Sequence, residues 1–393
     1  MRVLYVSDVY FPRVNGVSTS IRTFRSDLAA CGVESCLIAP DYAAEKSLPE
    51  ENIVRVAGAR IPRDPEDRRM RYGALRDALA RLRNESFDLV HIHTPFVAHY
   101  AGLRFARKLA IPCIATYHTF FEEYLHHYVP AMPRTAGRWL ARAFTRSQCR
   151  QLDALIAPSE AMRRTLIDYG VATPVHVVPT GLPAGRFKRG DGARFRRDIG
   201  IAPATPLVLY VGRVAFEKNI DFLVRSFKTA LSLEPSALLL IAGEGPAQAS
   251  IRALAVQLGI AASVRFVGYL ERDSVLLDCY AAADIFVFAS RTETQGLVLL
   301  EAMAQGTPVV SIAALGTTSI LAGERGAVVV PEDKDAFAQA VVSLLHDPRR
   351  RARLSLEGRE YAQTWSSLRM AQRLAAVYAE VNHGHATTAA QQI

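Results

Sequence analysis

The sequence predicts an α/β protein made of two doubly wound domains. Short apolar runs alternate with segments of helical periodicity along most of the 393 residues, a pattern typical of parallel sheets with helices on both faces. The alternation breaks once, around residues 179–206, where glycine, proline and charged residues are dense, and then restarts. Half of the residues are hydrophobic and 22% are charged, so the chain can bury two cores of ordinary size.

The first domain is expected over residues 1–185. Ligands of such sheets bind beyond the carboxyl ends of the strands, so the loops that follow the strands are the segments to search for a site. The expected strands are 3–8, 34–40, 87–93 and 111–118, and the expected helices are 17–31, 69–84 and 97–109.

The second domain is expected over residues 186–365, and it repeats the same alternation. Asp333 follows Pro331 and precedes an apolar helical segment, so it is expected to cap that helix rather than to hold a metal together with Asp335. A polar tail, 383–393, is expected to be flexible. The expected strands are 206–213, 237–243, 264–270, 284–290 and 307–312, and the expected helices are 219–233, 246–258, 273–282 and 296–305.

Several classes of protein are disfavoured by the composition. No run reaches the roughly 18 apolar residues of a membrane span, and Asp8 interrupts the first apolar run too early for a signal peptide, so a cytoplasmic protein is expected. The five cysteines include no Cys-x-x-Cys pair, which disfavours a zinc site or a disulfide framework. His91 and His93 are two residues apart, but no further ligand pattern accompanies them, and no metal is expected.

The net charge is +9, and eight arginines fall between residues 60 and 83. Such a cluster can meet anionic lipid headgroups, phosphorylated substrates or nucleic acid. Interleaved acidic residues equally allow a solvated helix face, and both interpretations stay open. A nucleic-acid-binding protein is disfavoured because aromatic residues do not interleave with the basic run. The arginines are Arg60, Arg63, Arg68, Arg69, Arg71, Arg76, Arg81 and Arg83.

The strongest site signal is the segment from Glu293 to Glu301. It follows the expected strand 284–290, and a helix is expected to start near Gly296. The free N–H groups of Gly296 and Leu297 would then suit a phosphate. The carboxylates of Glu293 and Glu301 can each accept two hydrogen bonds, so they suit the vicinal hydroxyls of a sugar or a ribose.

A second cluster follows the expected strand 206–213. Gly212 is followed by Arg213 and Lys218, and two cations at a strand end can bind a diphosphate. Pairing with surface carboxylates would explain either cation alone. The short motif Gly243-Glu244-Gly245 also lies between a strand and a helix, but by itself it is a weak signal.

Two further candidates lie in the first domain. Gly16 lies between a strand and a helix, where a missing side chain lets the backbone approach a ligand, although an ordinary turn explains one glycine equally well. His118 ends the strand 111–118, where its side chain can reach a strand-end site, although a lone histidine is more often structural.

In combination, these motifs resemble the retaining GT-B glycosyltransferases of family 4. The match extends over nearly the whole chain and keeps the family's order. Within that family the segments at His93–Phe96, Thr116–His118 and Glu293–Gly296 look most like bacterial lipid glycosyltransferases, such as those that act on diacylglycerol and phosphatidylinositol. The resemblance rests on Asn15-Gly16-Val17, Pro179-Thr-Gly181, Gly212-Arg213, Lys218, Gly243-Glu-Gly245, Glu293 and Glu301.

The resemblance implies two Rossmann-like domains that face each other across a cleft, with a helix at 366–381 returning to the first domain. It also implies a nucleotide-sugar donor and a front-face reaction that retains the anomeric configuration and needs no metal or other cofactor. Arg213 and Lys218 would bind the diphosphate, Glu301 the ribose, and Glu293 the donor sugar. Gly16 would approach the phosphates, and His118 would contact the sugar near its anomeric carbon. The base would lie near Gly268 and Leu270.

A hexosyltransferase of the glycolipid-forming kind is therefore expected, with a UDP-sugar favoured as donor over GDP-mannose. The acceptor expected is a hydroxyl of a membrane lipid such as diacylglycerol, which would place the enzyme peripherally on the inner face of the cell membrane. The Arg60–Arg83 region and the aromatic segment Phe120–Val129 are the expected docking surfaces. The same chemistry on a soluble or polysaccharide acceptor, and a sugar-nucleotide sensor without activity, are the alternatives.

Overall fold

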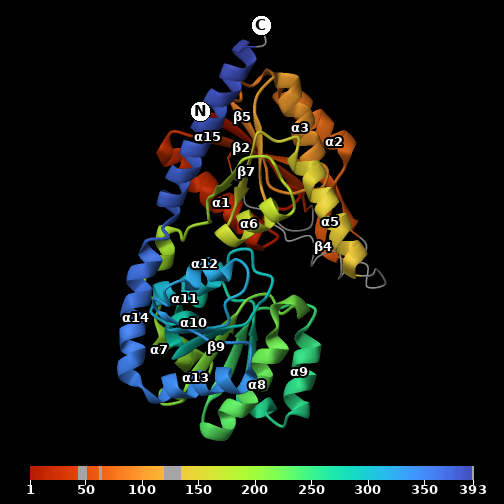
Figure 1. Ribbon diagram of the computed structural model, residues 1–393. Helices are drawn as coiled ribbons and strands as arrows, with labels where there is room; N and C mark the ends of the chain where they lie inside the picture. Colours follow the sequence, from red (N-terminus) through yellow and green to blue (C-terminus); the bar gives the residue numbers. More distant parts are fainter. Residues whose placement is uncertain (43–50, 62–63, 119–133, 392–393) are drawn as a thin grey trace. The chain divides into compact units, whose positions relative to one another are not determined.

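The computed structural model describes residues 1–42, 51–61, 64–118 and 134–391. The chain forms two compact units. Unit 1 comprises Met1–Gly181 together with Ser367–Ile393, and unit 2 comprises Leu182–Ser366 (Figure 1). The two ends of unit 2 meet, because the N–H of Leu182 donates a 2.8 Å hydrogen bond to the carbonyl of Trp365.

Unit 1 contains an eight-stranded sheet in the order β4-β3-β2-β1-β5-β6-β7-β8. All neighbouring strands are parallel except the pair β3 and β4, which is antiparallel. Apolar strands such as β1 are buried on both faces, as expected for a sheet covered by helices. The strands are β1 (Arg2–Val6), β2 (Glu34–Asp41), β3 (Ile53–Ile61), β4 (Asp64–Met70), β5 (Leu89–Ile92), β6 (Cys113–Thr116), β7 (Ala154–Ala157) and β8 (Val175–Val177).

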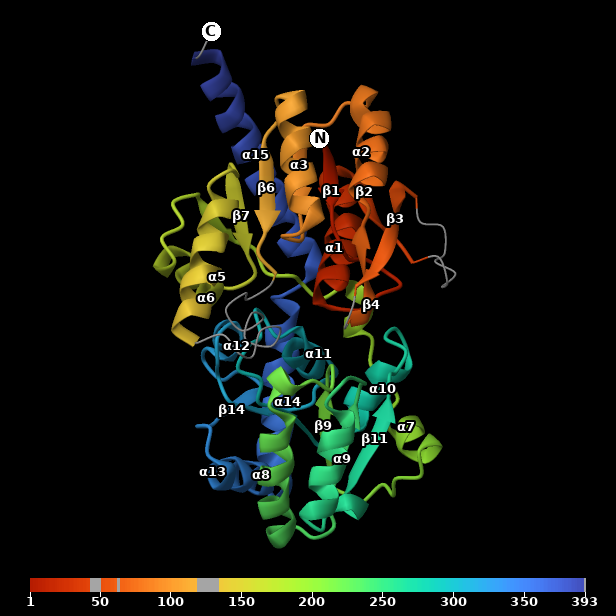
Figure 2. The same ribbon diagram turned by 90° about the vertical axis from the view of Figure 1, so that its right-hand side faces the viewer.

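Helices cover both faces of this sheet. One face packs against α1 and α15, whose apolar residues join those of β1 in one hydrophobic cluster. Figure 2 shows α2, α3, α5 and α6 on the opposite side of the strands. The α-helices of unit 1 are α1 (Gly16–Leu28), α2 (Tyr72–Arg81), α3 (Val97–Leu109), α5 (Arg134–Cys149), α6 (Glu160–Asp168) and α15 (Ser367–Gln391).

The arginine-rich region differs from its sequence prediction. A single helix over 69–84 was expected, but residues 64–70 form β4, and α2 begins only at Tyr72. Met70 is buried and the N–H of Arg71 bonds to the carbonyl of Ala57, so pairing with β3 outweighs the helical propensity of this charged segment. The arginines of this region are therefore divided between a strand pair and a helix.

Unit 2 contains a six-stranded parallel sheet in the order β11-β10-β9-β12-β13-β14. The strand order reverses direction at β9, with β10 on one side and β12 on the other. This is the position at which doubly wound sheets bind ligands. The strands are β9 (Leu207–Val211), β10 (Leu238–Ala242), β11 (Val264–Gly268), β12 (Ile285–Phe288), β13 (Val309–Ser311) and β14 (Ala327–Val329).

The helices of unit 2 lie on both faces of its sheet, as Figure 1 shows. Asp333 caps α13 as predicted, since its carboxylate accepts from the N–H groups of Asp335 and Ala336. The helices are α7 (Gly192–Asp198), α8 (Ile220–Leu233), α9 (Gln248–Gln257), α10 (Val275–Ala282), α11 (Leu297–Gln305), α12 (Thr317–Leu321), α13 (Lys334–His346) and α14 (Pro348–Gln363).

The segment expected to be a linker, residues 179–206, is more ordered than its composition indicates. It contains α7, and the N–H of Gly190 bonds to the side chain of Gln305. Both Asp191 and Arg194 hydrogen-bond to the buried carboxylate of Asp278 on α10. Tertiary partners thus order a stretch that lacks an apolar period of its own.

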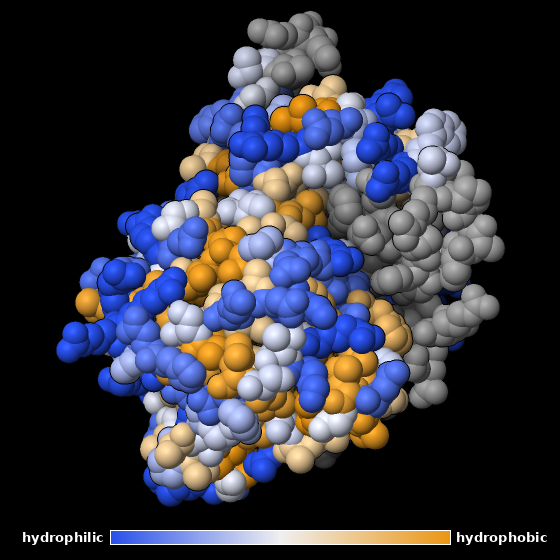
Figure 3. All heavy atoms as spheres, turned by 60° about the horizontal axis from the view of Figure 1, so that its bottom comes forward, coloured by the Kyte–Doolittle hydropathy of each residue, from blue (hydrophilic) through white to orange (hydrophobic). Residues whose placement is uncertain are grey.

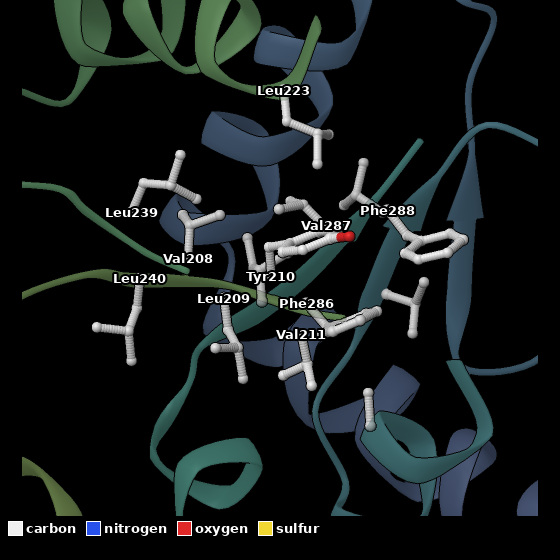
Figure 4. Close-up of a cluster of buried hydrophobic side chains, with 14 of the residues drawn as sticks. Val208, Leu209, Tyr210, Val211, Leu223, Leu239, Leu240, Phe286, Val287 and Phe288 are labelled. Atoms are coloured by element: carbon white, nitrogen blue, oxygen red, sulfur yellow. The ribbon is translucent and has the colours of Figure 1, made fainter. Parts of the chain in front are cut away.

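The core of unit 2 is rich in aromatic residues at its central strands. Tyr210 on β9 stacks with Phe288 on β12, with ring centroids 6.2 Å apart (Figure 4). Phe286 and Phe288 are also stacked, at 6.3 Å. These buried rings fix β9 against β12, and so they fix the starting points of the two loops in which the site was predicted.

Helix α15 continues to Gln391, and so it includes most of the tail 383–393 that the sequence predicted to be flexible. Its earlier turns pack through Tyr378 and Leu374 into the core of unit 1. Nucleation is therefore already complete, and adding residues such as Ala386 costs little. The side chain of His385 also lies 3.6 Å from that of Asp153.

None of the helices in the described part of the chain is long and apolar enough to cross a membrane. On the face that Figure 3 displays, hydrophobic side chains form separate groups among hydrophilic ones.

Candidate active site

The loops after β9 and β12 in unit 2 bring two of the predicted residues into direct contact. Lys218 Nζ lies 2.5 Å from Glu293 Oε1, and both side chains are about four-fifths buried. The residues are 75 positions apart in the sequence, yet β9 and β12 are neighbours in the sheet. The predicted convergence of Lys218 and Glu293 is therefore present in the structure.

Arg213 lies in the same loop as Lys218. Its carbonyl accepts a 3.2 Å hydrogen bond from the hydroxyl of Tyr210, and its guanidinium lies 3.9 Å from Glu217. The Arg213 side chain is nearly half exposed, so it can reach a ligand that approaches this loop. Burial raises the pKa of Tyr210 well above its ordinary value, and the charges of Glu293 and Glu217 raise it further, so this hydroxyl remains a donor.

The Glu293 loop is held by close backbone contacts. The N–H of Gly316 donates a 2.8 Å hydrogen bond to the carbonyl of Glu293. A Cβ atom at Gly316 would lie 2.1 Å from the carbonyl carbon of Thr294, so only glycine fits there. The side chain of Thr292 also bonds to the carbonyl of Glu217, which ties this loop to that of Lys218. Sequence reasoning missed Gly316, although a glycine follows the expected strand 307–312.

Gly296 and Leu297 begin α11 as predicted. Gly296 is the N-cap, with a φ of 95°, and Leu297 is the first helical residue. Gly296 has no side chain to bond the free N–H groups of the first turn, which leaves them available for a ligand. Helix α11 thereby places a positive dipole end beside the loop of Glu293.

Glu301 occupies a different environment from Glu293. It is only 4% exposed and accepts hydrogen bonds from Arg272 Nη2 at 2.6 Å and from the Tyr280 hydroxyl at 3.0 Å. Arg186 Nε lies 3.8 Å away. Each carboxylate oxygen of Glu301 therefore already accepts one hydrogen bond from a protein side chain. Sequence reasoning missed Arg272, Tyr280 and Arg186, because no local pattern links them to residue 301.

The loops after β9, β10 and β11 pack through glycines. The N–H of Gly243 donates to the carbonyl of Gly268 at 2.7 Å, and a Cβ at Gly243 would lie 2.0 Å from the carbonyl oxygen of Gly212. Beside them, the N–H of Tyr269 lies 3.4 Å from Glu244 Oε1. Leu270 packs partly buried against the core. The residues predicted to hold the base, Gly268 and Leu270, thus flank the exposed ring of Tyr269.

In unit 1, Gly16 is the first residue of α1. Asn15 caps this helix, since its side chain accepts a 2.8 Å hydrogen bond from the N–H of Ser18. No atom lies within 4 Å of the position that a Cβ on Gly16 would take. Local packing in unit 1 does not require glycine here, which leaves close approach of a ligand as a reason for it.

His118 belongs to a row of histidines at the ends of β5 and β6. Its Nε2 lies 3.2 Å from His93 Nδ1, and the two rings are stacked. His91 bridges the hydroxyls of Tyr378 and Thr116, each at 2.7 Å. Burial lowers the pKa of His118 to about 4 and lowers those of His91 and His93 well below the ordinary value. These imidazoles are therefore neutral at physiological pH.

Acid should destabilise unit 1 because of these histidines. Burial also lowers the pKa of His99 to about 4. Between pH 6.5 and 4 the unfolded chain therefore binds protons that the folded chain does not, and the free energy of unfolding decreases as the pH is lowered. Asp8, whose pKa burial raises to about 6, offsets part of this loss. We expect the melting temperature, followed by circular dichroism, to fall by roughly 5–10 °C between pH 7 and 5.

A pair of variants isolates the contribution of one histidine. His99→Phe keeps a buried ring but removes its titration, so the acid-induced fall should shrink. His383→Phe changes an exposed histidine of α15 and should leave the fall unchanged. Equal pH dependence in both variants would contradict the assignment.

Comparison with known proteins places this geometry in a family. Residues 191–361 match the family model described as glycosyl transferases group 1, and residues 14–186 match that of glycosyltransferase family 4. The chain is 34% identical to alpha-monoglucosyldiacylglycerol synthase of Streptococcus pneumoniae over 322 residues, which cover 79% of this chain and 71% of that protein. The chain belongs to glycosyltransferase family 4.

The name of another relative includes its sugar donor. This glycosyltransferase is 30% identical to a GDP-mannose-dependent alpha-mannosyltransferase of Mycobacterium tuberculosis, over 92% of this chain and 93% of the relative. Among solved structures, it is similar to sucrose-phosphate synthase from Thermosynechococcus elongatus, with a TM-score of 0.80, 21% identity and coverage of 98% and 100%. The two Rossmann-like units and this likeness confirm the GT-B fold class. The enzyme is a hexosyltransferase.

Some predicted residues lie outside the described structure. The aromatic segment Phe120–Val129 falls within 119–133, and the side chains of Arg60 and Arg63 are not described either. Of the remaining arginines in that region, Arg76 lies 3.2 Å from Asp77. The described residues contain no group of three or more histidine, cysteine or acidic side chains that could hold a metal ion.

Proposed function

We propose that this glycosyltransferase moves a hexose from a UDP-sugar to a hydroxyl of a membrane lipid such as diacylglycerol, with retention, to give an α-linked glycolipid. The contact between Lys218 and Glu293 supports the proposal, because a lysine suits a diphosphate and a neighbouring carboxylate suits the hydroxyls of a sugar. The similarity to a relative named alpha-monoglucosyldiacylglycerol synthase supports the lipid acceptor.

The proposed reaction takes place on one face of the donor sugar. The acceptor oxygen bonds to the anomeric carbon while the bond from that carbon to the β-phosphate oxygen breaks, and the acceptor's proton passes to the departing phosphate. Arg213, Lys218 and the N-terminus of α11 stabilise the charge that develops on the diphosphate. Glu293 orients the sugar by accepting from its hydroxyls. His118 is proposed to contact the sugar as a neutral imidazole.

We further propose that the reaction needs no metal ion, since the two cationic side chains and the helix N-terminus supply positive charge to the diphosphate. Activity should then persist after treatment with EDTA. Loss of activity in EDTA, restored by Mg²⁺ or Mn²⁺, would overturn this part of the proposal.

The test is a transfer assay with a panel of donors and acceptors. The purified chain is incubated with UDP-glucose, UDP-galactose or GDP-mannose and with diacylglycerol dispersed in detergent micelles. We expect a glycolipid from a UDP-sugar, with the α configuration by NMR. Transfer from GDP-mannose, which the mycobacterial relative's name favours, or transfer only to soluble sugars would replace the proposed donor or acceptor.

Glu293→Ala should separate turnover from donor binding. The variant loses hydrogen bonds to the sugar, so kcat should fall by about 10²-fold. Lys218 loses its protein partner but keeps its charge for the diphosphate, so UDP affinity measured by calorimetry should change little. Unchanged kcat, or loss of UDP binding together with kcat, would contradict the role assigned to Glu293.

A further inference from the structure

The solvent-facing side of α5 combines regularly spaced arginines with an exposed tryptophan. Arginine occurs at every fourth position from Arg134 to Arg150, and no acidic residue lies between them. Trp139 is 67% exposed and Leu140 is 42% exposed. Because Trp139 precedes Arg142 by three residues and Arg146 by seven, the three side chains share one face of the helix.

The exposed side of α3 has the same character. Phe96 and Tyr100 are more than half exposed, and Arg104 and Lys108 follow them on the same face. Helix α3 also contains no acidic residue. Two hydrogen bonds connect the helices or their flanks, from Gln148 Nε2 to the carbonyl of Pro95 and from Arg107 to Gln151. We call this surface of α3 and α5 the basic aromatic face; it comprises Phe96, Tyr100, Arg104, Arg107, Lys108, Arg138, Trp139, Leu140, Arg142, Arg146 and Arg150.

Helix α5 presents this face from a fixed position. On its inner side, Ala141 and Thr145 are buried, and the Thr145 hydroxyl lies 3.2 Å from that of Tyr117. The guanidinium of Arg142 lies over the ring of Tyr169, with 5.1 Å between Cζ and the ring centroid. The outward side chains therefore stand on a packed helix, which lowers the entropy lost when they bind a partner.

We propose that the basic aromatic face docks this glycosyltransferase onto an anionic lipid bilayer, a proposal that rests on the lipid acceptor of the proposed function. Arginines attract the acidic headgroups, and tryptophan and tyrosine rings partition into the headgroup region of bilayers. By contrast, Arg76 on α2, in the region where the sequence predicted docking, lies against Asp77. Exposed aromatics also suit single-stranded nucleic acid, but a lipid substrate brings this enzyme to a bilayer.

Trp139 offers a direct test, because the chain contains only one other tryptophan, Trp365. In a Trp365→Phe chain, the fluorescence of Trp139 is recorded with vesicles of phosphatidylcholine alone and with vesicles that also contain phosphatidylglycerol. We expect a blue shift with the anionic vesicles that salt reverses. No shift, or an equal shift with neutral vesicles, would overturn the proposal.

Flotation of the otherwise unchanged chain with the same vesicles gives a second measurement with matched controls. Arg146→Gln/Arg150→Gln should bind anionic vesicles roughly 30-fold more weakly, from about 1 kcal/mol per arginine. Arg349→Gln/Arg353→Gln removes the same charge from α14 in unit 2 and should bind normally. Trp139→Ser should weaken binding, whereas Leu356→Ser, an exposed apolar residue of α14, should not. Equal binding within each pair would overturn the proposal.

Two further measurements separate this proposal from its alternatives. Transfer to diacylglycerol in micelles should be normal in Arg146→Gln/Arg150→Gln. If diacylglycerol is not the acceptor, the unchanged chain will show no transfer in micelles but will still bind anionic vesicles. Binding of a single-stranded oligonucleotide without vesicle binding would overturn the membrane assignment and favour nucleic acid.

Discussion

Lys218→Ala should lower kcat by about 10²–10³-fold, because one preorganised cation is lost from the charge that develops on the leaving diphosphate. Affinity for UDP should fall as well, since in the proposed reaction the same ammonium binds the diphosphate before transfer. The partner carboxylate of Glu293 is about one-fifth exposed, so water can solvate it in part and the cost to folding should be smaller than for a fully buried pair. Steady-state kinetics and calorimetric titration with UDP measure both effects.

Lys228→Ala is the matched control for Lys218→Ala. Lys228 lies exposed on α8 in the same unit, so its removal lowers the net charge equally without touching the site. Its kcat should equal that of the unchanged chain. If the two variants had the same kcat, Lys218 would have no part in catalysis, and its contact with Glu293 would be structural.

Among the variants proposed for this protein, Glu301→Ala should cause the largest decrease in the free energy of unfolding. The substitution leaves Arg272 and Arg186 buried without their shared carboxylate and removes the acceptor of the Tyr280 hydroxyl. Breaking a buried ion pair by removing one partner costs about 3–5 kcal/mol. For a unit of this size we expect the melting temperature to fall by roughly 6–15 °C, as followed by circular dichroism.

Two further variants test the origin of that loss. Glu357→Ala removes a partly exposed carboxylate that lies 3.6 Å from Arg353 on α14, and its melting temperature should change by no more than about 2 °C. Glu301→Gln keeps a hydrogen-bond acceptor of similar size without the charge. Its melting temperature should lie between those of Glu301→Ala and Glu357→Ala. A melting temperature of Glu301→Ala close to that of Glu357→Ala would show that the buried charges need no compensation.

The contact between Lys218 and Glu293 could be predicted from the sequence because both residues follow the ends of strands. Lys218 and Glu293 each follow an apolar run that reads as a strand, and parallel strands place their carboxyl ends at one edge of the sheet. The surroundings of Glu301 could not be predicted in the same way. Its partners Arg272 and Arg186 come from a loop and from a segment that reads as a linker, and only packing brings them to one carboxylate.

The basic aromatic face shows the same division. The arginines of α5 are visible in the sequence at regular spacing, but their exposure depends on which side of α5 packs against the rest of unit 1. That side is set by buried residues such as Thr145, whose hydroxyl lies near that of Tyr117, and no local pattern identifies them. The helix expected over 69–84 begins later than predicted, because pairing with β3 keeps Arg69 and Met70 in β4 and α2 begins at Tyr72.

For this chain, the sequence by itself determined the alternating α/β architecture, the family and the loops that carry Lys218 and Glu293. These depend on apolar periodicity and on short motifs, which are local. The tertiary structure alone decided that Glu301 is enclosed by two arginines, that His118 is neutral beside His93, and that the tail continues α15. Each of these depends on burial and on partners far apart in the chain, and the free energy of a buried charge is set by its surroundings rather than by its neighbours in sequence.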